Sequence, residues 1–375
     1  MKKRIAASIL AIIMIMSLMT SCKSPWDSET EPATEETEII TEPETEPDPT
    51  EDPGYNPLTG LTNLPDGTNQ KRPVAIVISN IQAARPQWGL STPDICFEGL
   101  TEGGITRMLG FYADYTSIPK VGPIRSARHD FAELTQGFDA IYVHAGESVY
   151  ATEHFREYDM DDIDGNWYDG TFFKRDSERR RSRGLEHSMY IDAEELLNVM
   201  EYEETRTELN QAYKNVLTFA RVDDLTVPAT GACDQIDFSY SNTFDNSMLY
   251  DPVTHRYTKY QEGDVAVDAN NDNEVTYVNV LLLFTDVSSM GDSAGRIDMD
   301  LSGGNGIYVS RGRYENITWE KGDPTATLKL YRADGTVLPL NPGNSYIGLV
   351  PTSREDRVEI TSAEPETSSE AGTAQ

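Results

Sequence analysis

Short apolar runs alternate with segments of helical spacing in the first half of this chain. The runs at 73–79 (PVAIVIS) and 139–146 (DAIYVHAG) are rich in β-branched and aromatic residues and are bounded by turn residues, which predicts strands. Apolar residues recur every three or four positions at 126–136 and 192–203, which predicts helices. We therefore expect an α/β or α+β domain over residues 55–220.

The pattern changes to strands and turns in the second half. The run at 235–241 (QIDFSYS) alternates between the two faces of a strand, and the run at 277–284 (YVNVLLLF) is mostly apolar, as in a buried strand. Asp334 and Gly335 form a hairpin-turn pair, because the central positions of such a turn need positive φ angles. We expect a mostly β domain over residues 221–352.

The N-terminus carries the pattern of a bacterial lipoprotein signal. Basic residues at 2–4 precede an apolar run at 5–19, and small residues then lead to Cys22. We expect residues 1–22 to be the signal, with Cys22 as the lipidated first residue of a protein anchored on the outer face of the cell membrane. An uncleaved membrane-spanning helix is the alternative, but the run is short for a span of about 20 apolar residues.

Acidic segments flank the part of the chain that is expected to fold. Between Glu29 and Asp52 the sequence has eleven acidic residues, no basic ones, and repeated Thr and Pro. Such a segment cannot bury enough apolar surface to offset the entropy lost on ordering. We expect a disordered tether over residues 23–54 and a disordered tail over residues 353–375.

The formal net charge of the 375-residue chain is −32. Nucleic acid and anionic membrane surfaces favour basic faces, so we expect neither of them as a partner of the broad surface. A local basic pocket stays compatible with this charge.

Lipidation of Cys22 leaves Cys96 and Cys233. Cys96 lies in the apolar run DICFEGL, which favours a buried core residue, and a disulfide with Cys233 is the open alternative. The sequence has no CxxC or paired-cysteine metal pattern, and we expect neither a metal nor a cofactor.

The segment 120–131 (KVGPIRSARHDF) predicts an anion-binding turn. Gly122 and Pro123 form a turn before Arg125 and Arg128, and Ser126 is placed to cap the helix that follows. Backbone amides of a first helical turn and two forked guanidinium groups favour a phosphate or a carboxylate. The alternative is that both arginines pair with carboxylates of the chain itself, for instance Glu98 and Glu102.

A second hypothesis concerns acid/base chemistry. Glu98 and Glu102 lie four positions apart ahead of Arg107, and paired carboxylates act as general acid and base when their pKa values differ. His144 ends a predicted strand before a glycine loop, and His187 precedes a capped helix, so both could face the same cleft. Carboxylates at this spacing are also common in salt-bridge networks, and the sequence has no nucleophile elbow, P-loop or dinucleotide fingerprint.

The order of several motifs resembles the YerB-like lipoproteins of Gram-positive bacteria. FEGLTEGGITRMLGFY, KVGPIRSARHDF, DAIYVHAGES, EHSMY and LNPGNSYIGLVP carry the resemblance, which spans about residues 55 to 352. The family is catalogued as a domain of unknown function, so the resemblance implies a cellular location and an architecture but no reaction. The sequence departs from the family's pattern at His129 and around His187. The positions that match the family's signature are Glu98, Glu102, Gly103, Gly104, Arg107, Gly122, Pro123, Arg125, Ser126, Arg128, His144, Gly146 and His187.

Three functions are compatible with these residues. The favoured one is a non-catalytic envelope lipoprotein that binds an anionic wall polymer, a peptidoglycan fragment or an envelope protein. Its expected ligand-binding residues are Glu102, Arg107, Arg125, Ser126, Arg128, His144 and His187. The second is an envelope hydrolase or transferase that uses Glu102 or Glu98 with His144 as acid and base. The third is a structural scaffold whose arginines only join the domains.

Overall fold

The computed structural model describes residues 48–362 of the chain. The signal, Cys22, the tether up to residue 47 and the tail beyond residue 362 lie outside the described residues. Among residues 48–362, no helix is both long and apolar enough to cross a lipid bilayer.

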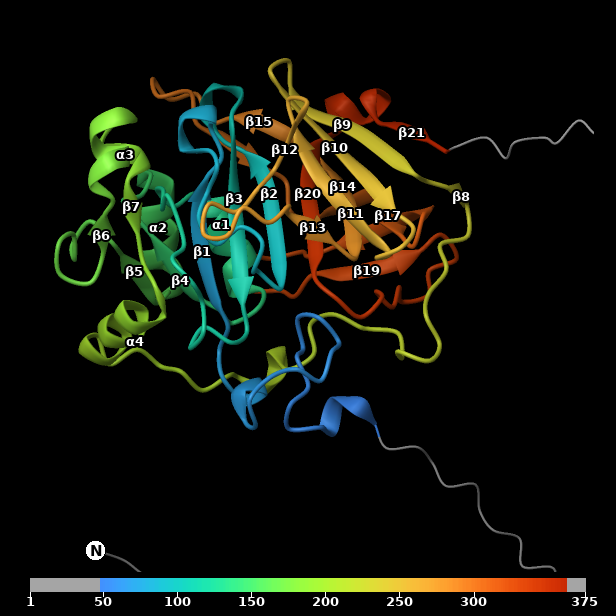
Figure 1. Ribbon diagram of the computed structural model, residues 1–375, viewed down its shortest axis with the longest axis horizontal. Helices are drawn as coiled ribbons and strands as arrows, with labels where there is room; N and C mark the ends of the chain where they lie inside the picture. Colours follow the sequence, from blue (N-terminus) through green and yellow to red (C-terminus); the bar gives the residue numbers. More distant parts are fainter. Residues whose placement is uncertain (1–47, 363–375) are drawn as a thin grey trace, which may run out of the picture. The chain divides into compact units, whose positions relative to one another are not determined.

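An eleven-stranded sheet runs through the described part of the chain (Figure 1). Its path consists, in spatial order, of β19 (Lys329–Arg332), β18 (Arg313–Glu320), β17 (Gly303–Ser310), β14 (Asn279–Thr285), β20 (Ser345–Pro351), β2 (Ile95–Leu100), β3 (Thr106–Tyr112), β1 (Val74–Ser79), β4 (Ile141–His144) and β5 (Asp162–Asp164). The short strand β8 (Gly231–Ala232) pairs with β18. The two halves of the chain meet where β2 pairs in parallel with β20, so they share one sheet.

A six-stranded sheet covers one face of this large sheet. It contains β12 (Asp264–Val265), β11 (Arg256–Gln261), β10 (Phe244–Asp251), β9 (Gln235–Ser241) and β21 (Glu359–Thr361), with β13 (Thr276–Tyr277) paired to β11. Two hairpin-like pairs complete the strands: β15 (Val287–Ser289) with β16 (Ile297–Met299), and β6 (Lys174–Arg175) with β7 (Met189–Tyr190). The α-helices are α1 (His129–Gln136), α2 (Val149–Tyr158), α3 (Ser177–Ser182) and α4 (Ala193–Tyr202).

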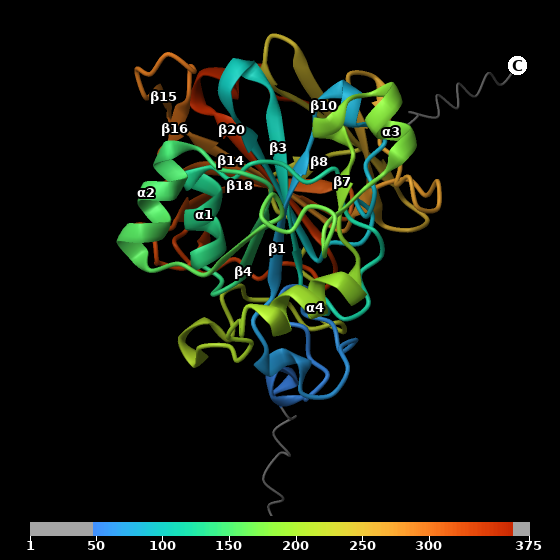
Figure 2. The same cartoon turned by 90° about the vertical axis from the view of Figure 1, so that its left-hand side faces the viewer.

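The alternation of side chains along β1 explains how the layers are held. Val74, Ile76 and Ile78 pack into the core that includes the six-stranded sheet, whereas Ala75 and Val77 pack into the core that includes α1. Successive side chains of a strand point to opposite faces, so a strand covered on both faces is apolar throughout. Figure 2 shows α1 and α2 on one side of the sheet.

The predicted fold class is confirmed. The described α-helices all lie in the first half of the chain, and the second half is mostly strands. The strand predicted at 73–79 is β1, and the helix predicted at 192–203 is α4, whose cap Asp192 accepts a hydrogen bond from the Glu195 amide at 3.1 Å. Cys96 and Cys233 are buried free thiols, as favoured over a disulfide.

The helix expected from Ser126 begins only at His129, and Ser126 does not cap it. The residues before it are extended, because the Arg125 amide donates to the Val77 carbonyl at 3.0 Å and the Ala127 amide donates to the Gly146 carbonyl at 2.8 Å. The helix start predicted at Ser126 is therefore wrong, since a neighbouring strand and a loop use the amides of Arg125 and Ala127.

The predicted tether and tail both extend too far into the folded part. Asp48 caps the short 3-10 helix η1 (Pro49–Glu51), within the segment predicted to be disordered. At the other end, β21 pairs with β9, and Val358 and Ile360 pack against the core. Alternating apolar residues thus add a strand where composition predicted disorder.

Glu98 of β2 is completely buried and forms an ion pair with Lys259 of β11. Its carboxylate accepts hydrogen bonds from Lys259 Nζ at 2.9 Å, Tyr346 OH at 2.8 Å, Asn80 Nδ2 at 2.8 Å and Thr106 Oγ1 at 2.7 Å. Burial raises the pKa of Glu98, but the charge and hydrogen bond of Lys259 outweigh burial and lower it. One carboxylate therefore joins strands from both halves of the chain.

Replacing Lys259 should strongly destabilise the fold. Lys259→Met leaves the Glu98 carboxylate buried without its cation, and breaking a buried pair in this way costs about 3–5 kcal/mol. Urea unfolding at pH 7 measures the loss. The matched control is Lys71→Met, which removes the exposed pair with Glu208 (41% and 75% side-chain exposure) and should cost about 1 kcal/mol or less. Equal losses in the two variants would contradict the role given to Glu98.

Candidate functional site

The predicted site residues lie mainly at one edge of the large sheet. Strands β14, β20, β2, β1, β4 and β5 all run in the same direction, because they are linked by parallel pairs and by two antiparallel pairs through β3. Loops at the carboxyl ends of parallel strands are where α/β sheets place functional groups. Glu102 follows β2 there, Arg107 lies at the start of β3, and His144 ends β4.

Arg107 and Arg128 converge on Glu102 at this edge. Arg128 Nε donates to Glu102 Oε2 at 2.9 Å, and Arg128 Nη2 contacts Oε1 of the same carboxylate. Arg107 Nη2 lies 3.4 Å from Glu102 Oε1, while its Nη1 donates to the Ser126 carbonyl at 2.6 Å. Both arginines are buried, so Glu102 holds two desolvated guanidinium groups.

The charges around Glu102 change the pKa of the groups involved. Burial raises the pKa of Glu102, but the hydrogen bond and charge of Arg128 and the charge of Arg107 outweigh it and lower the pKa to about 2. Burial and then the repulsion of Arg128 lower the pKa of Arg107 to about 9. Glu102 is therefore ionised at neutral pH and has no proton to donate as a general acid.

Arg125 lies next to this pair and faces a different carboxylate. Its Nη1 donates to Glu186 Oε2 at 2.7 Å, and the side chain of Arg125 is 20% exposed while that of Glu186 is 69% exposed. His187 follows Glu186, and burial and the charge of Arg125 lower its pKa. We call Arg107, Arg125 and Arg128 with Glu102 and Glu186 the arginine cluster.

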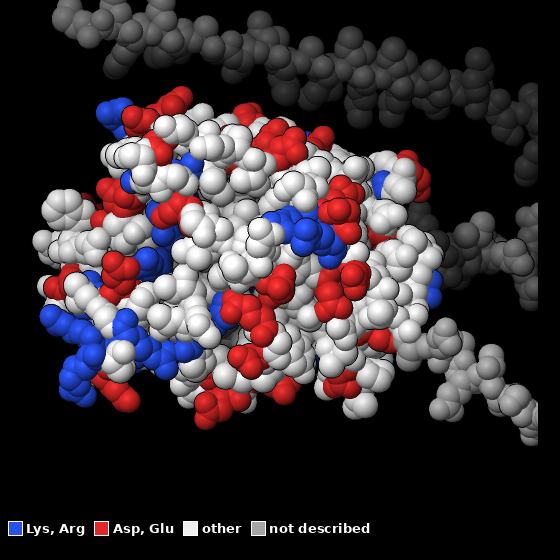
Figure 3. Space-filling model, turned by 90° about the horizontal axis from the view of Figure 1, so that it is seen from above, with Lys and Arg blue, Asp and Glu red and all other residues white. Residues whose placement is uncertain are grey.

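The arginine cluster carries more positive than negative charge, since three guanidinium groups face two carboxylates. Burial first, and then the charges of neighbouring arginines, lower the pKa values of Arg107 and His187. Figure 3 shows a patch of Lys and Arg at the lower left of that view, while Asp and Glu are spread over much of the rest.

Glu98 and His144 lie in the interior rather than beside Glu102. Glu98 is held by Lys259, and the His144 ring bonds through both nitrogens, to the Gly146 carbonyl and to Asp162 Oδ2, each at 3.0 Å. Both side chains are completely buried. The geometry therefore separates the carboxylate pair expected from the sequence and gives Glu98 and His144 structural bonds.

Tyr142 and Glu186 belong to this region but did not stand out in the sequence. Burial raises the pKa of the Tyr142 hydroxyl, and the Arg128 backbone and the charges of Arg107 and Arg128 partly offset this. Tyr142 lies two positions before His144 in β4, and residues at that spacing share one face of a strand. Glu186 is adjacent to His187, but only the fold brings it to Arg125.

Two groups of side chains have atoms close enough to hold a metal ion, although the sequence predicted none. They are His144 with Glu147 and Asp164, and His129 with Asp130 and Asp298, and in each group the ligand atoms lie within 4.8 Å of one another. Both nitrogens of His144 lie 3.0 Å from oxygens outside the first group, so a metal ion bound by this imidazole would have to displace one of these contacts.

Family models match both halves of this two-part, strand-rich chain. The N-terminal domain of a protein family of unknown function (DUF3048) matches residues 58–206, and the C-terminal domain of the same family matches residues 235–347. The chain belongs to this family.

The chain is similar to YerB of Bacillus subtilis (strain 168), which is named as a lipoprotein. The two are 32% identical over 300 residues, which cover 79% of this chain and 86% of that protein. The crystal structure of YerB from Bacillus subtilis superimposes with a TM-score of 0.70 at 29% identity and covers 82% of this chain and 99% of that one. The resemblance to YerB-like lipoproteins that the motifs indicated is confirmed.

Glu102→Gln should lower stability in a pH-dependent way. The pKa of Glu102 is lower in the folded chain than in the unfolded one, so its contribution is complete well above pH 4.5 and is lost as the pH falls toward 2. With partial solvent contact taken into account, we expect a loss of about 1–2 kcal/mol at pH 7 that shrinks by half or more at pH 3. Urea unfolding at both pH values measures it.

The control is Glu153→Gln, on an exposed position of α2. It should change the free energy of unfolding by less than about 0.5 kcal/mol at either pH. A pH-independent loss in Glu102→Gln would instead indicate a packing defect and would contradict the ionic role of Glu102.

Proposed function

We propose that this chain is a lipoprotein anchored through Cys22 on the outer face of the cell membrane, where it binds an anionic component of the cell envelope. The signal pattern that ends at Cys22 and the similarity to the lipoprotein YerB support the anchor. The arginine cluster supports the binding activity. A wall polymer with phosphate groups or a peptidoglycan fragment with carboxylates has the chemistry that such a cluster recognises.

The observation that carries this proposal is the excess positive charge of the arginine cluster in an otherwise acidic protein. Arg107 and Arg128 are fixed by Glu102, whereas Arg125 is partly exposed and its partner Glu186 is mostly exposed. An arriving anion can therefore displace Glu186 from Arg125 without disturbing the buried pair. Forked guanidinium groups bind phosphate and carboxylate with two parallel hydrogen bonds, which gives orientation as well as affinity.

A catalytic role has less support from the same side chains. Glu102 is ionised, and Glu98 and His144 are buried and hydrogen-bonded. A general acid or base needs to reach the proton that it transfers, at about 2.6–3.2 Å or through one water. We therefore place binding ahead of hydrolysis or group transfer.

Arg125→Gln should abolish the stabilisation of the protein by anionic envelope fragments. The wild type should show a melting temperature that rises with the concentration of polyglycerol phosphate or of muropeptides, because both would bind only the folded state. Arg125→Gln should fold normally and lose at least tenfold in affinity, since one charge-assisted contact is worth about 1.5–3 kcal/mol. Thermal unfolding and titration calorimetry measure both effects.

Arg296→Gln is the matched control. Arg296 is 26% exposed and pairs with one carboxylate, Asp292, at 2.6 Å, so its environment resembles that of Arg125 but lies outside the arginine cluster. The Arg296→Gln variant should keep the affinity of the wild type for both fragments. A wild type that responds to neither fragment, or a control that loses as much affinity as Arg125→Gln, would refute binding at this cluster.

A further inference from the structure

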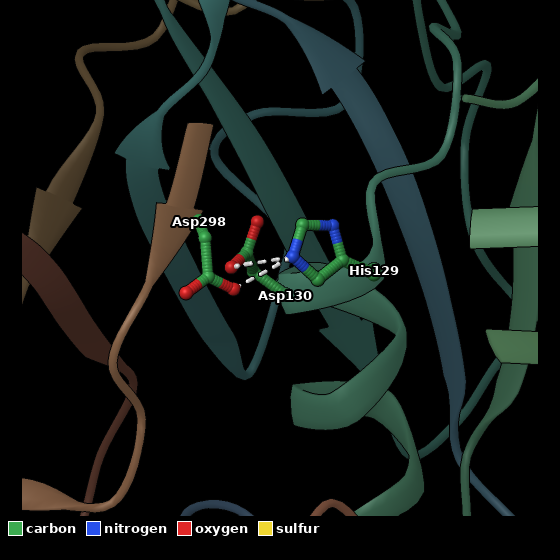
Figure 4. Close-up of side chains that lie close together, drawn as sticks. All are labelled: His129, Asp130 and Asp298. Carbon is green, nitrogen blue, oxygen red and sulfur yellow. Dashed lines mark hydrogen bonds and ion pairs between the residues drawn. The ribbon is translucent and has the colours of Figure 1, made fainter. Parts of the chain in front are cut away.

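His129, Asp130 and Asp298 bring three metal-ligand atoms together next to the arginine cluster (Figure 4). His129 Nε2 lies 3.0 Å from Asp298 Oδ1 and 3.5 Å from Asp130 Oδ1. His129 and Asp130 open helix α1 in the first half of the chain, and Asp298 is the central residue of β16 in the second half. The family signature does not include these three residues, and neither the anion site nor the buried Glu98 pair uses them.

The spacing of these atoms matches that of ligands around one ion. Zn²⁺ binds imidazole nitrogen and carboxylate oxygen at about 2.0–2.2 Å, which places tetrahedral ligands roughly 3.4 Å from one another. The observed separations of 3.0 and 3.5 Å lie around this value. One imidazole and two carboxylates suit a first-row transition metal, whereas Ca²⁺ and Mg²⁺ prefer oxygen ligands throughout.

The charge around these atoms favours a cation. The carboxylates of Asp130 and Asp298 both lie within 3.5 Å of the His129 imidazole, and Asp130 is only 2% exposed. The Met299 amide donates to Asp130 Oδ1 at 2.8 Å and holds that oxygen in place. An ion with two positive charges would offset the two carboxylate charges.

The nitrogen of His129 that faces the two carboxylates is Nε2, whereas Nδ1 is buried and has no hydrogen-bond partner within the described residues. An ion bound at Nε2 leaves the ring proton on Nδ1, and a water would then accept the hydrogen bond from Nδ1. The contacts at Nε2 therefore carry the argument for the site.

We propose that His129, Asp130 and Asp298 bind one divalent transition-metal ion of the Zn²⁺ or Mn²⁺ type. The protein supplies one nitrogen and two oxygen ligands, and water completes the coordination. The ion ties β16 to the start of α1 and so connects the two halves of the chain at the same edge as the arginine cluster. Arg128, which holds Glu102, directly precedes the ligand His129, so the ion also fixes the position of the arginine cluster.

Calorimetric titration of the full chain with Zn²⁺ and with Mn²⁺ tests this site. We expect the wild type to bind at least one of the two ions with one-to-one stoichiometry at this site and to gain hydrogen-exchange protection over residues 287–299. Asp298→Asn removes a ligand oxygen from a side chain that is 47% exposed, so the fold should persist while the affinity falls more than about tenfold and the added protection disappears.

Two further variants keep the result interpretable. Asp286→Asn removes one exposed carboxylate at the base of the same hairpin and should leave affinity and protection unchanged, which separates ligation from a general charge effect. His129→Gln should lose binding as Asp298→Asn does. The proposal is overturned if the wild type binds neither Zn²⁺ nor Mn²⁺ when the ion is in excess over the protein. It is also overturned if Asp298→Asn has the metal affinity of the wild type, or if Asp286→Asn loses as much metal affinity as Asp298→Asn.

Discussion

The ion pair between Glu98 and Lys259 is the contact on which the arrangement of the two halves depends. Both side chains are completely buried, and removing two charges from water is repaid only when geometry and hydrogen bonds are nearly complete. The carboxylate meets this condition because Asn80, Thr106 and Tyr346 also donate to it. These residues come from distant parts of the chain, so the charges can be buried only after β2 has paired with β3 and β20 and has been covered by β11.

The same pairing produces the edge that carries the polar side chains. When β2, β20, β1 and β4 align in one direction, the loops that follow them meet at their carboxyl ends. Close backbone contacts fix the loops there. A Cβ on Gly122 would lie 2.6 Å from the Met189 carbonyl oxygen, and Gly146 has a φ of +75°, which residues with a side chain rarely adopt, so both positions favour glycine.

The start of α1 then lies between carboxylates that come from different halves of the chain. Arg128 faces Glu102, which lies in the loop after β2. Its neighbour His129 faces Asp298, which lies in β16. Consecutive residues thus contribute to the proposed anion-binding cluster and to the proposed cation-binding group. A shift of either half would change both, which gives the protein a physical route by which the two proposed sites can influence each other.

The sequence by itself determined much of the local structure and the family of this protein. The apolar runs predicted strands such as β1 and β14, the capping pattern at Asp192 predicted the start of α4, and the motifs identified the family. The site could be predicted only in part, because Glu102 was named as a possible partner of Arg125 and Arg128, whereas Glu186, the partner of Arg125, was not. Spacing along the chain does not show that Glu98 faces the interior and Glu102 the edge, since this depends on where β2 ends and β3 returns.

Only the tertiary structure decided that Lys259 neutralises Glu98, that Glu186 meets Arg125, and that Asp298 reaches His129 across 169 positions. Such long-range pairs follow from strand register, which is set by the packing of the whole core rather than by any local pattern.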